Sequence, residues 1–315
     1  MKSNEINRRR FIGTLAAATA GVAVTGFMPV FGSSTAGTNK KMTVSASNSV
    51  YGTIGTYGAP SRGNDGKADI KKLMDELKSI HCNTFHWLMC CHHPDDMDSL
   101  QQFLPLARRQ KIKVWITLIP PSEEKLGVSE PYGLDFDKWA EELAKLSLRE
   151  KNLVAWSIDD YVHNLNYFTP QYMEKLIGIA KKVNPDFLFI PCCYYRQITD
   201  DFIRKYIDFI DGLLFPYRAE SEGANLTNPN LVEAEIKRVR EMIPKKIPIF
   251  LDIYATPHSR LGATTPEYIK TVLDTGLKTA DGVLIYTHND AIHDAEKHEI
   301  IKKGFKGYKP NFKKQ

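Results

Sequence analysis

The sequence lacks several short motifs that would assign it to a common functional class. The first predicted turn, Gly55-Thr56-Tyr57-Gly58, does not have the glycine spacing of a dinucleotide-binding fingerprint. Neither H-E-x-x-H nor C-x-x-C occurs, so the usual zinc spacings are missing. We therefore expect no bound cofactor.

Excess charge and a long apolar run are also missing. The net charge is +5, of which a net +3 lies in residues 1–36, and the remainder is too nearly balanced to favour nucleic acid as a partner. The apolar stretch from Gly13 to Phe31 is interrupted by Thr14, Thr19 and Pro29. A membrane-spanning helix needs about 20 strongly apolar residues, so we expect no stable membrane anchor.

The first residues have the features of an export signal. Arg8-Arg9-Arg10-Phe11 precedes the weakly apolar stretch, and Ser34-Thr35-Ala36 offers a small-residue cleavage site. The Arg-Arg-x-Phe pattern resembles the twin-arginine type of signal. We expect residues 1–36 to be a signal peptide, residues 37–49 a polar linker, and the mature protein to be periplasmic or secreted.

Cysteine is scarce, and all five cysteines follow the predicted signal. An odd number in an exported chain leaves at least one thiol unpaired or in an intermolecular bridge. Four of the five form two adjacent pairs, Cys90-Cys91 and Cys192-Cys193, and the fifth is Cys82. Sequence leaves open whether the paired cysteines are free, bridged or metal-bound.

Eight apolar segments alternate with eight amphipathic segments between residues 51 and 304, and this count and length predict a single (β/α)8 TIM barrel over residues 50–310. Thr169-Pro170 and Thr265-Pro266 are typical helix starts, with a capping threonine and proline at the first helical position. The predicted strands are Tyr51–Tyr57, Thr84–Cys90, Lys113–Ile119, Leu153–Asp159, Phe187–Cys193, Gly212–Tyr217, Ile247–Tyr254 and Asp281–Thr287.

The fourth predicted strand ends in two adjacent carboxylates, Asp159 and Asp160. Barrel enzymes place their active site at the carboxyl ends of the strands. Two neighbouring carboxylates do not ionise independently, so one of them is expected to keep a proton beside its charged partner, which suits cleavage of a glycosidic bond. The structural alternative is that one aspartate caps the next loop while the other pairs with Arg196 or Arg218.

Other strand ends carry aromatic and polar residues that suit a carbohydrate substrate. Rings stack on sugar faces, and hydroxyl, amide and charged groups bind sugar hydroxyls. We predict that the substrate is held by Tyr161, Tyr194, Tyr217, Arg218, Asp252, Tyr254, Tyr286, His288 and Asn289.

The segment Trp156-Ser157-Ile158-Asp159-Asp160-Tyr161 resembles the adjacent-aspartate site of barrel glycoside hydrolases of the O-GlcNAcase and hyaluronidase type, which are N-acetylhexosaminidases. The resemblance implies that Asp159 orients the 2-acetamido group of the substrate and that Asp160 is the general acid/base. The chitinase-type motif, with an acid at every second position and a final glutamate, is absent.

Three alternatives stay open. A two-carboxylate hydrolase without substrate assistance would pair Asp160 with Asp252 across the barrel. A metal-dependent hydrolase or isomerase would use the cysteines, histidines and aspartates of the strand ends, including Cys90, His92 and His288. A non-catalytic carbohydrate-binding barrel would use the same face. The glycan, its linkage, the stereochemical outcome and the oligomeric state are not fixed by the sequence.

Overall fold

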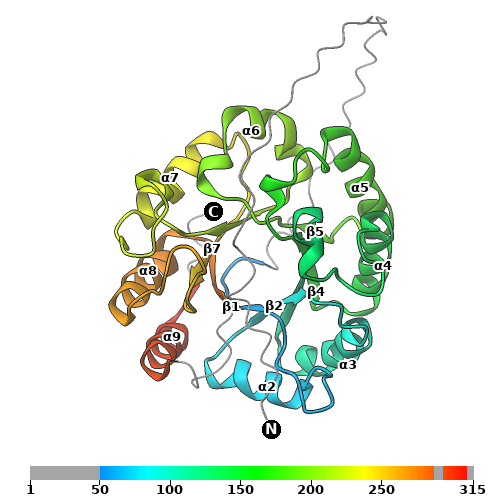
Figure 1. Cartoon of the computed structure of the whole chain (residues 1–315), viewed down its shortest axis with the longest axis horizontal. Helices are drawn as coiled ribbons and strands as arrows, with labels where there is room; N and C mark the ends of the chain where they lie inside the picture. The colour runs from blue at the N-terminus through cyan, green and yellow to red at the C-terminus, as the bar shows by residue number, and fades with distance from the viewer. Residues whose placement is uncertain (1–49, 287–293, 311–315) are drawn as a thin grey trace, which may run out of the picture.

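Eight short parallel strands alternate with helices in the computed structural model, which describes residues 50–286 and 294–310. The predicted (β/α)8 architecture is therefore confirmed, and the helices form a ring around the strands (Figure 1). The strands are β1 (Thr53–Gly58), β2 (Thr84–Met89), β3 (Lys113–Leu118), β4 (Leu153–Ile158), β5 (Leu188–Phe189), β6 (Leu213–Pro216), β7 (Ile249–Tyr254) and β8 (Gly282–Tyr286).

The helices begin at capping side chains that the sequence makes visible. Thr169 and Thr265 each accept a hydrogen bond from the backbone three residues on, and a proline follows each at the first helical position. The helices are α2 (Ile70–Ser79), α3 (Asp96–Arg109), α4 (Phe136–Arg149), α5 (Pro170–Val183), α6 (Asp200–Tyr206), α7 (Val232–Met242), α8 (Pro266–Thr279) and α9 (Ala295–Gly307).

The barrel closes irregularly between β5 and β6. The sheet order is β5-β4-β3-β2-β1-β8-β7-β6, and a single parallel bridge, Cys192 to Leu214, joins its two outer strands. Leu214 donates its backbone N–H to Pro191 (3.0 Å), and its carbonyl accepts from Cys193 (2.8 Å). Pro191 has no N–H to donate, which explains why the regular part of β5 is shorter than the predicted strand.

Side chains alternate between the barrel interior and the layer under the helices. His86 of β2 stacks on Tyr57 of β1 with ring centroids 4.4 Å apart, and Trp115 of β3 meets Phe250 of β7 at 4.7 Å. Because β3 and β7 are not neighbours in the sheet, this second contact crosses the interior. Trp87, one residue after His86, packs instead against Phe103 of α3.

The predicted signal peptide and linker lie outside the described residues. Among the helices that the structure does describe, none is both long and apolar enough to cross a bilayer.

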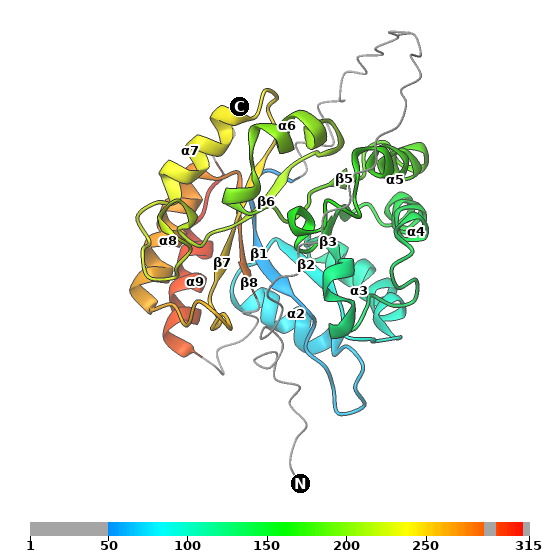
Figure 2. The same ribbon diagram turned by 45° about the horizontal axis from the view of Figure 1, so that its top comes forward.

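The view in Figure 2 shows the strands running side by side through the centre of the helical ring.

Two helical glycines differ in what a methyl group would meet. A Cβ at Gly276 of α8 would lie 2.4 Å from Leu251 Cδ2, whereas nothing lies within 4 Å of a Cβ at Gly178 of α5. We expect Gly276→Ala to lower the free energy of unfolding by about 1–3 kcal/mol through overpacking. Gly178→Ala should raise it by about 0.5–1 kcal/mol. Denaturant unfolding measures both, and equal stabilisation by the two variants would contradict the close packing of α8 on β7.

Candidate active site at the carboxyl ends of the strands

The backbone turns sharply where β4 ends, and this turn brings the two aspartates together. Asp159 still donates its N–H to Leu118 of β3 (3.0 Å), whereas Asp160 adopts φ +45°, in the left-handed region. Aspartate tolerates this region better than most residues. The N–H of Asp160 donates to Asp159 Oδ1 (3.1 Å), and one oxygen from each carboxylate lies within 4.8 Å of Cys192 Sγ.

Asp160 is held by two side chains. The Tyr194 hydroxyl donates to Asp160 Oδ1 at 2.5 Å, and His163 Nδ1 lies 3.7 Å from Oδ2. The short 3-10 helix Tyr161–His163 places residue 163 above residue 160, as its three-residue turn requires. The Asp160 side chain keeps 25% of its surface exposed, so it remains accessible from the face of the barrel.

Tyr194 is the centre of a stack of charged and aromatic groups. The His163 ring lies parallel to it, with centroids 4.9 Å apart, and the Arg218 guanidinium carbon lies 3.9 Å from its centroid. Arg218 in turn donates from Nε to Glu220 Oε1 (2.8 Å), and Glu220 Oε2 accepts the Arg196 N–H (2.9 Å). Among the described contacts, the ion-pair partner of Arg218 is thus Glu220, not one of the two aspartates.

These contacts decide the charge of Asp160. Burial by itself raises the pKa of Asp160, but the nearby His163 imidazole, the hydrogen bond from Tyr194 and the positive charge of Arg218 outweigh burial. The pKa of Asp160 is therefore lower than that of an ordinary aspartate. At neutral pH this residue is a carboxylate.

A different carboxyl group is shifted towards its protonated form. Asp252, in β7, is 1% exposed, and its Oδ1 has no hydrogen-bond partner among the described residues. Burial raises the pKa of Asp252 well above its ordinary value, and the nearby charge of Asp159 raises it further. The resemblance implies that Asp160 is the general acid/base, but the directions of the two pKa shifts favour Asp252 as the group that keeps a proton.

Five of the predicted substrate-binding residues gather around these carboxyl groups. The Tyr254 ring lies 5.2 Å from that of Tyr286, centroid to centroid, and Tyr286 lies 5.1 Å from Tyr57 in the interior. Burial raises the pKa of the Tyr254 phenol well above its ordinary value, while the Arg218 charge opposes the shift. The five residues are Tyr194, Arg218, Asp252, Tyr254 and Tyr286.

Tyr161 and Tyr217 do not join this cluster. Tyr161 is fully buried against Phe168 and Phe189, and the Tyr217 hydroxyl donates to the Asn228 carbonyl at 2.7 Å. Both rings therefore lie in the layer beneath the helices, and both residues leave the candidate substrate-binding set. Proximity to a strand end does not fix the side to which a ring turns. His288 and Asn289 lie outside the described residues.

Two residues that the sequence did not single out contribute to the cluster, His163 and Glu220. Each follows its partner at a short spacing, Asp160-x-x-His163 and Arg218-x-Glu220. Apart from this spacing the sequence gives no sign that Glu220 is buried, although it is 2% exposed in the short 3-10 helix Glu220–Glu222.

A metal-binding ring of the predicted size is not assembled in the described part of the chain. Asp159, Asp160 and Cys192 form the one group of three ligand atoms there that is close enough to hold an ion. His92 instead lies 3.3 Å from Glu130 through Nδ1. Two carboxylates and a thiol suit a zinc-like divalent ion in chemical type.

Comparison with known proteins supports the fold. No protein-family model matches the sequence, and no curated protein matches it. The structure is similar to a β-galacturonidase from Eisenbergiella tayi, with a TM-score of 0.55 and 11% identity over 83% of this chain. It is also similar to an endo-1,4-β-mannanase from Rhizomucor miehei, with a TM-score of 0.56 and 9% identity over 81% of this chain.

An endoglucanase from Pseudomonas stutzeri gives a TM-score of 0.52 and 10% identity over 80% of this chain. The match covers 52% of the β-galacturonidase, but 93% of the endoglucanase and 95% of the mannanase. The chain thus spans about half the length of the first of these enzymes. At these identities the similarity shows a barrel fold of the kind these glycoside hydrolases have.

The hydrogen bond from Tyr194 to Asp160 makes a direct prediction. Tyr194→Phe should raise the pKa of Asp160, because a donor that favours the carboxylate is removed. A depressed carboxyl pKa stabilises the fold above the unfolded-state pKa, and this stabilisation is lost as the pH falls, so the variant should lose less stability on acidification. Carbon-detected NMR titration of the carboxyl groups measures the shift. Tyr195→Phe, at the neighbouring position, is the control, and an unchanged Asp160 pKa in Tyr194→Phe would refute the contact.

Proposed function

We propose that this protein is a glycoside hydrolase that acts at the carboxyl ends of its strands. The observation that carries the proposal is a group of three aspartates, Asp159, Asp160 and Asp252, in which the surroundings lower the pKa of Asp160 and raise the pKa of Asp252. Glycosidic bond cleavage needs both forms, one to supply a proton to the leaving oxygen and one to stabilise or attack the sugar. Enzymes of similar fold that cleave glycosidic bonds agree with this choice.

The carboxyl groups divide the chemistry by their surroundings. Asp160 is the more accessible group, and its donors keep it ionised, so we assign it to the positive charge that develops at the anomeric carbon. Asp252 supplies the proton to the leaving oxygen, and the Asp159 charge helps Asp252 to keep that proton until substrate arrives. Tyr254 and Tyr286 offer ring faces to the sugar, and Arg218 holds Tyr194 in place.

Substitution of each carboxyl group tests this division. Asp160→Asn should lower kcat/KM on aryl glycosides by about 10²–10⁴-fold without unfolding the chain, because the amide keeps the shape and loses the charge. Asp252→Asn should cause a loss of similar size, since an amide cannot give up a proton as an acid does. The control is Asp274→Asn, at a half-exposed residue paired with Lys270 on α8. Full activity in Asp160→Asn would overturn the assignment.

The more detailed part of the proposal is which sugar the enzyme cleaves. If the resemblance to N-acetylhexosaminidases holds, Asp159 orients a 2-acetamido group, and aryl N-acetylhexosaminides are cleaved much faster than the corresponding hexosides. If Asp160 and Asp252 act without substrate assistance, the acetamido group gives no such advantage. A panel of paired aryl glycosides separates the two mechanisms. Binding without any product would instead favour a carbohydrate-binding barrel.

A metal-dependent hydrolase is the second candidate, because Asp159, Asp160 and Cys192 bring three ligand atoms within 4.8 Å of one another. Elemental analysis of the purified protein and treatment with a chelator distinguish the two. Under the glycosidase proposal, chelation leaves both the activity and the melting temperature unchanged. Loss of activity on chelation, with recovery on adding zinc, would favour the metal enzyme.

Export through the twin-arginine route is part of the same proposal, since an extracellular glycan is cleaved outside the cytoplasm. The double substitution Arg8→Lys and Arg9→Lys keeps the positive charge of the signal but removes the arginine pair that the export receptor recognises. We expect this double variant to remain in the cytoplasm when the full chain is expressed with a twin-arginine system. Export at the normal level would remove the twin-arginine assignment.

A further inference from the structure

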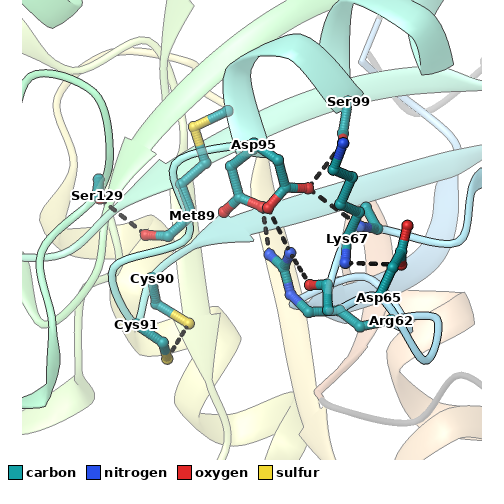
Figure 3. A network of polar contacts seen from close by, with 12 residues as sticks. Arg62, Asp65, Lys67, Met89, Cys90, Cys91, Asp95, Ser99 and Ser129 are labelled. Carbon is teal, nitrogen blue, oxygen red and sulfur yellow. Dashed lines mark hydrogen bonds and ion pairs between the residues drawn. The ribbon is translucent and has the colours of Figure 1, made fainter.

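The turn after β2 holds two adjacent cysteines with their sulfurs close together. The Cys91 thiol donates to Cys90 Sγ at 2.6 Å, as Figure 3 shows. Cys90 is 3% exposed, whereas Cys91 is partly exposed. Neighbouring side chains in an extended strand point to opposite faces, so this contact needs a special backbone.

The backbone at this turn is left-handed at two successive positions. Cys91 has φ +70° and His92 has φ +54°, which is costly for residues other than glycine. The turn is held by the loop after β3, because Cys91 N–H donates to the Gly127 carbonyl (3.2 Å) and His92 N–H to that of Val128 (3.3 Å). A Cβ at Gly127 would lie 2.6 Å from Cys91 Cα, so this contact requires glycine.

An ionic network fixes the start of α3 at Asp96, four residues after His92. Arg62 Nη1 lies 2.9 Å from Asp95 Oδ1, and Asp95 Oδ2 accepts hydrogen bonds from Ser99 Oγ (2.9 Å) and the Ala68 N–H (3.1 Å). On the other side, Ser129 Oγ donates to the Met89 carbonyl at 2.8 Å. Figure 3 shows the cysteine pair between these two supports. The turn is therefore held from both ends.

The second adjacent pair, Cys192-Cys193, has a different geometry. Cys192 Sγ faces the two aspartates at the carboxyl end of β4. Cys193 lies near Tyr161, in the layer beneath the helices. Burial is the main cause that raises the pKa of the Tyr161 phenol, and the nearby Cys193 raises it further. The two sulfurs thus lie on opposite faces of the sheet, and this pair is a natural control for the first.

We propose that Cys90 and Cys91 are a redox modification site, which a small-molecule disulfide converts into a disulfide between adjacent residues. The Cys90–Cys91 sulfur–sulfur bond forms, the sulfur–sulfur bond of the small molecule breaks, and the two cysteine S–H bonds give up their protons. A cysteine thiolate attacks the small-molecule disulfide, and the two electrons and two protons convert that disulfide into two released thiols. The preformed contact between the sulfurs favours closure of the ring over a mixed disulfide.

This site lies at the same height as the candidate active site. Met89, Leu118 and Ile158 are in register across β2, β3 and β4, so Cys90 and Asp159 follow at one level, about 10 Å apart across two strand spacings. Cys90 follows His86 by four residues and lies on the same, interior side of its strand. The inference concerns thiol chemistry alone and does not depend on the proposed glycosidase activity.

Peptide mass mapping of the full chain tests the proposal. The folded protein is incubated with oxidised glutathione, denatured and alkylated, and then cleaved with trypsin, which releases Ser79–Arg108 as one peptide. We expect this peptide to carry one alkyl group, at Cys82, and to be lighter by two hydrogen masses at Cys90 and Cys91. Both Cys192 and Cys193 should be alkylated, and prior treatment with dithiothreitol should restore alkylation at Cys90 and Cys91.

Two variants complete the test. Cys91→Ser should abolish the loss of two hydrogens, whereas Cys82→Ser should leave it unchanged. Full alkylation of Cys90 and Cys91 in the oxidised wild-type protein would overturn the proposal, and so would a glutathione adduct at Cys91 or a bond from Cys82. These outcomes are read from the wild-type chain, so they do not depend on the folding of a variant.

Discussion

The left-handed backbone at Asp160 is the constraint on which the candidate site depends. In a continued strand, Asp159 and Asp160 would point to opposite faces of the sheet. With φ +45° at Asp160, the chain turns as β4 ends, and the N–H of Asp160 bonds to the carboxylate beside it. The same turn begins the 3-10 helix that carries His163 over Asp160, and so the turn explains both the approach of the two aspartates and the position of the histidine beside them.

The charges of the site follow from a competition between burial and hydrogen bonding. Asp160 and Asp252 are both removed from bulk water to a large degree, which favours the neutral form of each. Asp160 has Tyr194, His163 and Arg218 around it, and these groups reverse the effect of burial. Asp252 has the charge of Asp159 nearby and an oxygen without a partner among the described residues, and so the effect of burial is reinforced. The pKa values of two chemically identical side chains are thereby shifted in opposite directions.

Much of the fold was predictable from local signals. The apolar segments of β1 to β4, the threonine caps of α5 and α8, and the prolines after them all occur where the sequence places them. The exception is the end of β5, where Pro191 removes a ladder donor and leaves a single bridge to Leu214. A count of apolar residues does not reveal that this hydrogen-bond donor is missing.

The site was less predictable, because its properties come from residues distant in sequence. The position of Asp159 and Asp160 follows from the strand count, but the charge of Asp160 depends on Tyr194 and Arg218, which come from the ends of β5 and β6. Tyr161 and Tyr217 follow strands, as the other predicted site residues do, yet each ring turns towards the helices, against Tyr206 of α6 and Tyr268 of α8. One residue of register changes the face on which a side chain lies, and sequence spacing at a strand end does not resolve it.

The central claim is that Asp252 holds a proton at neutral pH while Asp160 does not. Infrared difference spectroscopy tests it most directly, since a protonated carboxylic acid has a carbonyl stretch that a carboxylate lacks. Burial also raises the pKa of Asp96, to about 7, so the diagnostic signal is the difference between the wild type and each variant. We predict such a band at pH 7 in the wild-type minus Asp252→Asn difference spectrum and none in the wild-type minus Asp160→Asn spectrum. A band in the wild-type minus Asp160→Asn spectrum and none in the wild-type minus Asp252→Asn spectrum would contradict the account.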